Sequence, residues 1–406
     1  MSSYFQGLAT FACYFTGMQL IEVKDKKTAE TFIQVNVIIN RDNPNYIRPL
    51  DKDIHDVFDE KKNKAFRFGT AKRWILVNAQ GEPIGRIAAF VNKKYRNKGD
   101  DIPVGGMGFF DCIHDQSAAD MLLDVAKHWL MQQGMQAMDG PINFGERDRW
   151  WGLVVEGFQS PLYCMNYNPP YYQSLLENYG FRPFFYQLCL GLDPQKKLSE
   201  KILKRHAQLA EDPNYSARHI DKNKLEKFAA DFATVYNEAW AGHGGLKELR
   251  TEQVLLMFQK MSPVMDEKIV WFAYYRERPI AIFTNLPDLN QWFRHLNGKF
   301  GVWHKIKFLW IKNTVTCKKF TGLVFGIVPD FQAKGVDAYI IGEAAKVIQS
   351  PKMHYQEYEM QWIGDFNPKM LNVGLSLGDT FITRRLCTYR YLFDRTKEFK
   401  RHPILA

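Results

Sequence analysis

The sequence predicts an α/β protein of two domains, each a mixed, mostly antiparallel sheet with flanking helices. Two observations lead to this fold class. Strand-like apolar runs alternate with amphipathic helical segments along the chain, and the order of the first half recurs in the second half with little sequence identity. At 406 residues the chain is also too long for one hydrophobic core, so two domains are expected.

The first half begins with a strand and an amphipathic helix, separated from the following elements by a polar stretch that contains two prolines. Asp115 is a suitable N-cap for the helix that comes later, because its carboxylate can accept from the free N–H groups of the first turn. The predicted elements are a strand at 19–25, a helix at 26–39, a hairpin at 72–92, a strand at 105–113, a helix at 116–134 and a strand at 135–142.

The second half repeats this order after a charged segment, 193–214, which we interpret as a linker containing one helix. We therefore expect domains at 18–192 and 215–398. Residues 1–17 fit neither domain; "YFQG" resembles the remnant of a cleaved tag, and Met18 would be a sensible natural start. The predicted elements are a strand at 215–221, helices at 222–240 and 251–261, a hairpin at 268–285, a strand at 320–329, a helix at 333–349, a strand at 353–363, a short helix at 367–378 and a strand at 381–393.

Composition narrows the class of partner. The net charge of +10 suits an anionic partner such as a nucleotide cofactor, a nucleic acid or an acidic membrane surface. No window is long and apolar enough for a transmembrane segment, and the six scattered cysteines favour a reducing, cytoplasmic setting and no metal site. The chain lacks hydrolase motifs and DNA-binding modules, so no DNA partner is expected.

The most specific pattern is "VFGIVPDFQAKGVDAYIIGEAAKVI". A strand that ends in a glycine-containing loop before a helix presents several backbone N–H groups to one point and so makes an anion site. GCN5-related N-acetyltransferases mark this position with Gln/Arg-x-x-Gly-x-Gly/Ala. The sequence resembles a tandem pair of such domains over roughly residues 18–395, with Gln332–Asp337 at the motif.

The resemblance implies that each sheet contains a splayed pair of parallel strands. It also implies that the second domain binds acetyl-coenzyme A or another acyl-coenzyme A, with a backbone N–H near Ile327 and Val328 polarising the thioester. The cofactor-binding residues expected on this basis are Ile327, Val328, Gln332, Ala333, Lys334, Gly335, Val336 and Asn367.

The sequence departs from the family pattern at two positions of the second domain. Asp337 stands where glycine or alanine is usual, and a carboxylate there would repel a phosphate unless it points away. Gly374 stands where the family commonly has a proton-donating tyrosine. The first domain contains a segment like the family's short helix, 168–181, but no cofactor motif, so we interpret it as a degenerate copy that shapes the acceptor site.

Amine acylation needs a group that takes a proton from the attacking amine. Glu357 and Glu359 alternate onto one face of the predicted strand at 353–363 and are the candidate bases. Tyr358 is the candidate proton donor. A solvated sheet face is the alternative interpretation of these residues.

Two further segments have an open role. The loop "GPINFGERDRWWG" could recognise the acceptor through Glu146, Arg147, Arg149 and Trp150, or serve as scaffold whose tryptophans fill the groove of the first domain. The insertion at 290–319 holds seven Lys/Arg and no Asp or Glu. It could be an amphipathic cover for a core, a lid over the cofactor, or a membrane- or nucleic-acid-binding surface.

The sequence thus predicts an acyl-coenzyme A-dependent N-acyltransferase in which the amine of a small molecule or peptide attacks directly in a ternary complex, acetyl being the expected acyl group. One alternative is a non-catalytic binding protein that keeps the fold. Another is an aminoacyl-tRNA-dependent transferase, for which the basic insertion would contact tRNA. The pattern does not define an oligomeric state.

Overall fold

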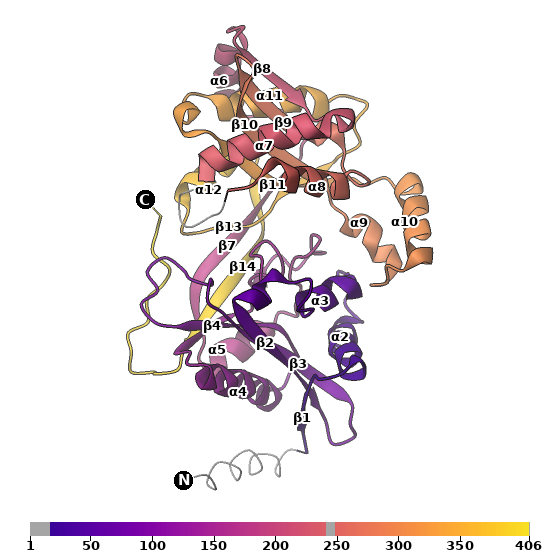
Figure 1. Ribbon diagram of the computed structural model, residues 1–406, viewed down its shortest axis with the longest axis vertical. Coiled ribbons are helices and arrows are strands. Elements are labelled where there is room, and N and C mark those ends of the chain that lie inside the picture. The colour runs from indigo at the N-terminus through magenta and orange to yellow at the C-terminus, as the bar shows by residue number, and fades with distance from the viewer. Residues whose placement is uncertain (1–16, 241–247, 406) are drawn as a thin grey trace.

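The computed structural model describes residues 17–240 and 248–405 and consists of two stacked lobes joined by long strands (Figure 1). Mixed sheet and flanking helices confirm the predicted fold class. Residues 1–16 of the predicted N-terminal extension lie outside the described residues. No helix in the described part of the chain is long and apolar enough to cross a membrane.

The lower lobe follows the predicted order and also contains α3 (Asp51–Val57), β6 (Leu153–Glu156) and β7 (Arg182–Leu192), which lie in segments that the sequence pattern did not mark as helix or strand. Asp115 caps α4 as predicted, its Oδ1 accepting from the Ala118 N–H at 2.9 Å. The elements are β1 (Gln19–Glu22), α2 (Lys26–Asn40), α3, β2 (Gly69–Val77), β3 (Pro83–Asn92), β4 (Val104–Cys112), α4 (Gln116–Gln132), β5 (Ala137–Gly140), β6, α5 (Tyr172–Tyr179) and β7 (Arg182–Leu192).

The upper lobe begins with α6 (Glu200–Ala210), a helix from the predicted linker that packs on α11. The basic insertion forms two helices that project from the side of the molecule (Figure 1). The remaining elements are β8 (Tyr215–His219), α7 (Leu225–Trp240), α8 (Thr251–Met261), β9 (Val270–Tyr275), β10 (Arg278–Pro287), α9 (Asn290–Phe293), α10 (Val302–Thr314), β11 (Lys319–Ile327), α11 (Val336–Ile348), β12 (Glu357–Met360), β13 (Ile363–Gly364), α12 (Pro368–Leu375) and β14 (Phe381–Leu392).

One continuous sheet runs through both lobes, in the order β1-β2-β3-β4-β5-β14-β7-β12-β11-β10-β9-β8. The two halves exchange their last strands. β14, from the end of the chain, pairs with β5 of the lower lobe, while β7, from the first half, pairs with β12 of the upper lobe. β14 and β7 also pair with each other along most of their length, so they form the connection between the lobes (Figure 1).

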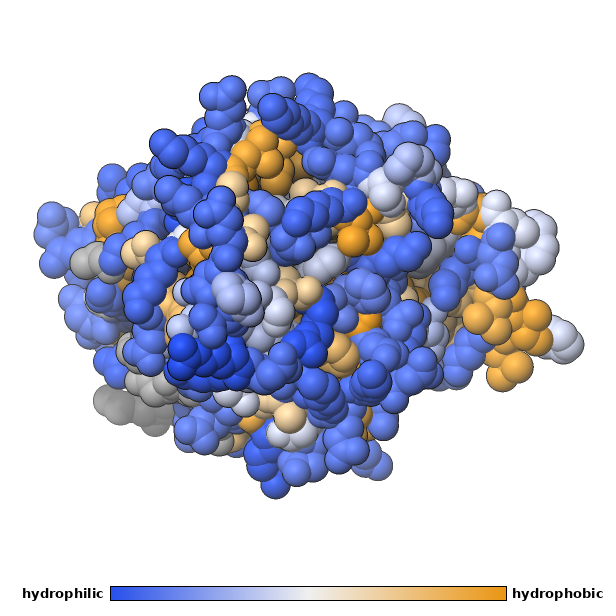
Figure 2. Space-filling model, turned by 90° about the horizontal axis from the view of Figure 1, so that it is seen from above, coloured by the Kyte–Doolittle hydropathy of each residue, from blue (hydrophilic) through white to orange (hydrophobic). Residues whose placement is uncertain are grey.

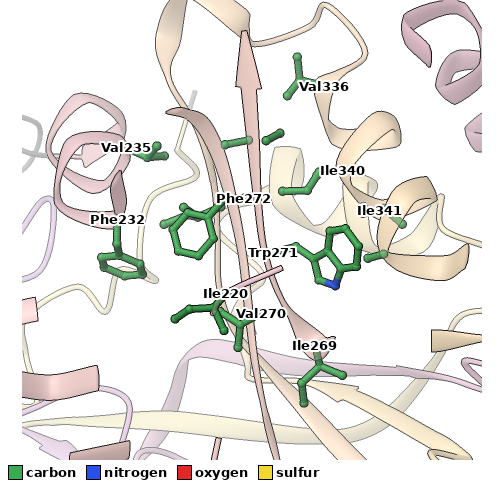
Figure 3. Close-up of a cluster of buried hydrophobic side chains, with 14 of the residues drawn as sticks. Ile220, Phe232, Val235, Ile269, Val270, Trp271, Phe272, Val336, Ile340 and Ile341 are labelled. Carbon is green, nitrogen blue, oxygen red and sulfur yellow. The ribbon is translucent and has the colours of Figure 1, made fainter. Parts of the chain in front are cut away.

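The core of the upper lobe lies on both faces of β9 and β10 (Figure 3). Phe232 and Val235 of α7 pack on one face of these strands, and Ile340 and Ile341 of α11 approach from the other. Apolar residues at helical spacing on α7 and α11 pack against alternating residues of the strands. These two periodicities are the sequence pattern that predicted a sheet with flanking helices. These contacts hold α11 against the sheet and so fix the position of the loop that leads into it.

Each lobe contains one short parallel strand pair. In the lower lobe β4 pairs with β5 over three residues, and in the upper lobe β11 pairs with β12 over four. Beyond these positions β4 and β11 continue while their partners leave. The splayed parallel strands expected from the family resemblance are therefore present in both lobes.

Candidate active site

The splayed strands of the upper lobe border an open cleft of about 300 Å³. Its walls come from β11 on one side, the segment after β12 on the other, and α12 at the base. The lining is almost wholly apolar: Trp240, Phe283, Gly322, Leu323, Val324, Phe325, Ile341, Tyr358, Met360, Gln361, Trp362, Ile363, Asn367, Met370, Val373, Gly374 and Leu377.

The backbone of β11 has a free edge toward this cleft. The Val328 N–H donates to the Ile280 carbonyl at 3.0 Å, so residues 324, 326 and 328 bond to β10. Because bonding alternates along an antiparallel pair, Phe325 and Ile327 direct their N–H and C=O groups to the other side, where β12 has diverged. Of the two expected polarising N–H groups, that of Ile327 faces the cleft, and that of Val328 is already used by β10.

The loop that follows β11 presents the start of α11. Ala333 and Gly335 adopt positive φ, 59° and 90°, which turns the chain sharply into the helix. Gln332 closes the loop by donating from Nε2 to the Ile327 carbonyl at 3.0 Å. Lys334 is exposed, and the buried Val336 begins the helix. The first-turn N–H groups and Lys334 make this end of α11 electropositive.

Asp337 does not oppose an anion at this loop, because its carboxylate is bound elsewhere. Arg205 of α6 donates to it through two nitrogens, at 2.7 and 2.9 Å. This paired, two-point contact orients the carboxylate toward α6 and compensates its charge. The first departure from the family pattern therefore has a structural explanation.

The second departure, Gly374, is explained by packing. A Cβ at this position would lie 2.5 Å from Leu190 Cδ1 and 3.3 Å from Met360 Sδ, so any larger residue there would require Leu190 of the exchanged strand β7 to move. Asn367 caps α12, its Oδ1 accepting from the Met370 N–H at 3.2 Å, and lines the cleft beside it.

Tyr358 lies in the wall of the cleft with its hydroxyl over Gly322, where a Cβ would be only 2.2 Å from the phenol oxygen. Burial raises the pKa of Tyr358 well above its usual value, so the phenol stays protonated at neutral pH. A protonated phenol in this wall can donate a hydrogen bond into the cleft.

The two candidate carboxylates lie at the root of the splayed strands and not among the described residues that line the cleft. Glu357 is exposed at the start of β12, 3.6 Å from Lys319. Glu359 is fully buried and accepts from Arg384 at 2.7 Å, from Lys319 at 2.5 Å and from Thr383 at 2.8 Å. Burial alone would raise the pKa of Glu359, but Arg384 and Lys319 outweigh it and hold that pKa below its ordinary value. This environment favours a structural ion pair over a base.

The corresponding groove of the lower lobe is largely filled by the chain itself, which leaves a cavity of about 60 Å³. The Ile142 N–H donates to the Met107 carbonyl at 2.8 Å, which keeps the loop after β5 beside β4 as both chains run onward. Trp150, at φ 43°, packs its ring 5.7 Å from that of Phe109, and Trp151 lies in the same buried cluster. Within the described residues, neither indole N–H has a hydrogen-bond partner.

The other candidate acceptor residues surround a second, lower-lobe cleft of about 430 Å³, which shares no lining residue with the first. Arg147 donates to the Arg96 carbonyl and to Asn97 Oδ1, both at 3.1 Å, and lies over the Trp151 ring. Arg149 is 3.4 Å from Glu146. The structure thus groups Glu146, Arg147 and Arg149 but separates them from the cofactor residues.

The sequence did not indicate the two arginines that bind carboxylates near the site, Arg205 and Arg384. Arg205 and Arg384 lie far along the chain from the carboxylates that they bind. Arg384 left one signal: it alternates with Leu386, Thr388 and Arg390 along one face of a strand that also carries large apolar residues, and a charged residue buried in such a strand needs a partner.

Comparisons with known proteins agree with this geometry. No protein-family model matches the chain. The chain is 22% identical over 366 residues to the bacterial ceramide synthase of Caulobacter vibrioides, covering 89% of this chain and 94% of that protein. It is also 22% identical over 361 residues to protein YghO of Escherichia coli K12, covering 86% and 89% of the two chains.

Two solved structures share the arrangement across the whole chain. A tandem GNAT protein from the clavulanic acid biosynthesis pathway matches 94% of this chain and 100% of its own, at 10% identity and a TM-score of 0.51. The GCN5-related glucosamine N-acetyltransferase region of a fungal multi-domain β-N-acetylglucosaminidase matches 93% at 12% identity and a TM-score of 0.53, and the chain spans 38% of that longer protein. The chain therefore has the tandem fold of GCN5-related N-acetyltransferases.

Proposed function

We propose that the protein transfers the acyl group of an acyl-coenzyme A to an amine, with the coenzyme in the open cleft of the upper lobe. The observation that carries this proposal is the free edge of β11, which leads directly into the electropositive start of α11. A pantetheine amide would pair with Phe325, since the Ile327 carbonyl already accepts from Gln332. The pyrophosphate would lie at the loop Gln332–Val336, with Lys334 beside it.

The thioester supplies an activated carbonyl carbon. The acceptor nitrogen attacks this carbon, the C–N bond forms, the C–S bond breaks, and the amine releases a proton to solvent or to a group of the acceptor site. The Ile327 N–H would donate to the carbonyl oxygen as charge develops there. Tyr358 would donate to the leaving sulfur from the wall of the cleft. The mostly apolar lining limits the number of water molecules beside the reacting atoms.

The acceptor that we propose is a long-chain amino alcohol. A ceramide is the amide of such an amine, and a relative with this activity in its name aligns over nearly its whole length. The apolar cleft suits a long acyl chain as well as it suits acetyl. Acetyl transfer to a small-molecule or peptide amine, the expectation from sequence, is the alternative.

A substitution that closes the cleft tests the proposal. Leu323 lines the cleft and is 36% exposed, so Leu323→Trp should fold and fill the cleft as Trp150 fills the lower groove. We expect acetyl- or palmitoyl-coenzyme A to raise the Tm of the wild type by a few degrees and to leave Leu323→Trp unchanged. Leu256→Trp, on the exposed side of α8, is the matched control. No shift of the wild type at millimolar concentrations of either thioester would contradict the proposal.

Product analysis then identifies the donor and the acceptor. Sphinganine and a simple peptide amine are each incubated with acetyl- or palmitoyl-coenzyme A, and amides are detected by mass spectrometry. The long-chain proposal predicts N-palmitoylsphinganine as the main product. Acetylated peptide alone would support the alternative and exclude the long-chain acceptor.

A further inference from the structure

The helix α10 exposes a row of large apolar side chains that the proposed chemistry does not use. Val302, Trp303, Ile306, Leu309 and Trp310 are between 53% and 80% exposed, and we call this row the α10 outer face. Single exposed apolar residues are common, but five on one short helix form a patch that requires a partner. Figure 2 shows an apolar patch at the right-hand edge of the molecule, on the side where Figure 1 places α10.

The α10 outer face is distinct from the side of the helix that packs into the hydrophobic core. At 3.6 residues per turn its five side chains cover about a third of the helix circumference. Phe308 and Ile311 occupy the opposite side, where they are buried against Trp292 and Phe293 of α9. One side of α10 is therefore packed against α9, and a second apolar side is exposed to solvent.

The Lys, Arg, Asp and Glu residues of α10 itself are all lysines, whereas Asp266 lies near Lys312 at the end of the helix. Lys305 and Lys312 flank it on one side of the helix and Lys307 on the other. Two of these side chains are held in place, since Lys307 Nζ donates to the His295 carbonyl at 2.8 Å and Lys312 Nζ donates to the Pro263 carbonyl. The insertion 290–319 contains seven Lys/Arg and no Asp or Glu.

We propose that the α10 outer face binds the surface of an anionic lipid bilayer, with α10 lying parallel to the membrane plane. An apolar face bordered by lysines, with tryptophans at its edge, matches the boundary between acyl chains and negative headgroups. A second copy of this chain would bring cations against cations. A nucleic acid would leave Val302, Ile306 and Leu309 without a role. A bilayer uses both the apolar and the basic residues.

Vesicle sedimentation of the full chain tests this without any substrate, so its outcome is independent of the proposed transferase activity. We expect binding to phosphatidylcholine vesicles that contain about one third phosphatidylglycerol, weaker binding to pure phosphatidylcholine, and a decrease with added salt. Trp303→Glu combined with Trp310→Glu should weaken binding by more than about tenfold. Lys305→Gln should weaken it by about fivefold on anionic vesicles only.

Met131→Glu is the matched control, because Met131 is 51% exposed on α4 of the lower lobe and its replacement should not change vesicle binding. An unchanged Tm shows that each variant is folded. Equal binding of the wild type and the double tryptophan variant would overturn the proposal. It would also be overturned if the wild type ignored anionic vesicles and instead formed dimers that the tryptophan substitutions disrupt, or bound tRNA at low salt.

Discussion

The two parallel strand pairs, β4–β5 and β11–β12, resemble each other in their paired segments and differ beyond the point where the strands separate. We call the paired segment of each its root. At each root a buried carboxylate, Asp139 on β5 or Glu359 on β12, is paired with an arginine of β14. Arg390 contacts Asp139 at 2.6 Å, and Arg384 contacts Glu359 at 2.7 Å. Above the root, the lower groove is filled by the loop after β5, whereas the upper cleft is open along β11.

The paired residues at the roots stabilise the fold, whereas the space beyond the roots determines whether a ligand can bind. The roots are polar, buried and fully paired, so they fix where the strands part. In each lobe an N–H after the short parallel strand still donates to the neighbouring strand, Ile142 to the Met107 carbonyl at 2.8 Å and Gln361 to the Gly322 carbonyl at 3.0 Å. The lobes differ in the next residues, because the tryptophans of the loop after β5 pack into the lower groove. The same framework thus yields a closed groove in one lobe and a ligand-sized cleft in the other.

The largest effect is expected from removing an arginine of a root. Arg384→Met or Arg390→Met leaves a buried carboxylate without its arginine and should lower the free energy of unfolding by about 3–5 kcal/mol. Arg385→Met on the same strand breaks only the exposed pair with Glu156 and should cost less than about 1 kcal/mol. Urea unfolding measures all three. Equal losses in the three variants would show that the roots carry no special stability.

The Glu359 root should also respond to pH. The folded-state pKa of Glu359 is lowered, so its stabilising effect is present above the unfolded pKa of about 4.3 and is lost as the pH falls through the folded pKa. We expect the urea midpoint of the wild type to fall below about pH 4. Glu359→Gln should be less stable at neutral pH and should show a shallower decrease. An identical slope in both proteins would assign the acid response to other groups.

Opening the closed groove is the next test. Trp150→Ala removes a buried ring and should cost about 3 kcal/mol. Trp150→Phe keeps a ring and removes the unpaired indole N–H, so it should cost less than about 1.5 kcal/mol. Neither variant should change the Kd for acyl-coenzyme A, measured by calorimetry. Loss of that affinity in the folded Phe variant would place the lower groove in the ligand site.

A smaller effect is expected inside the open cleft. Tyr358→Phe keeps the ring and removes the hydrogen-bond donor, so kcat should fall by about tenfold to a hundredfold with little change in the Kd for the thioester. Tyr355→Phe is the control, because the Tyr355 hydroxyl donates to Asp266 at 3.0 Å, away from the cleft. Unchanged kcat in Tyr358→Phe would remove the phenol from the proposed chemistry.

The smallest effect concerns the loop before α11. Lys334→Gln removes one exposed, mobile charge and should weaken acyl-coenzyme A binding by about threefold, less at high salt. Dephospho-coenzyme A esters, tested in parallel, report whether the charge acts on the pyrophosphate or on the adenosine phosphate. A gain in affinity would contradict the electropositive role of this loop.

The sequence was sufficient for the fold class and for the position of the loop Gln332–Val336, because both depend on local periodicity and turn chemistry. It was not sufficient for the strand exchange: β7 and β14 are both apolar strands, and their local patterns do not determine which edge each will pair with. The alternation that placed Glu357 and Glu359 on one face was local too, whereas the burial of Glu359 depends on Arg384 and on the distant strand that carries it.

The position of β14 has a consequence for biosynthesis. Its residues, Phe381–Leu392, are synthesised after all the other strands and helices described above, yet they cover β5 and neutralise Asp139 in the lobe that is made first. A nascent chain that has emerged only as far as β5 therefore has an uncovered strand edge and an uncompensated carboxylate. The lower lobe can reach its final structure only after β14 has emerged, so the two halves mature together and not in order of synthesis.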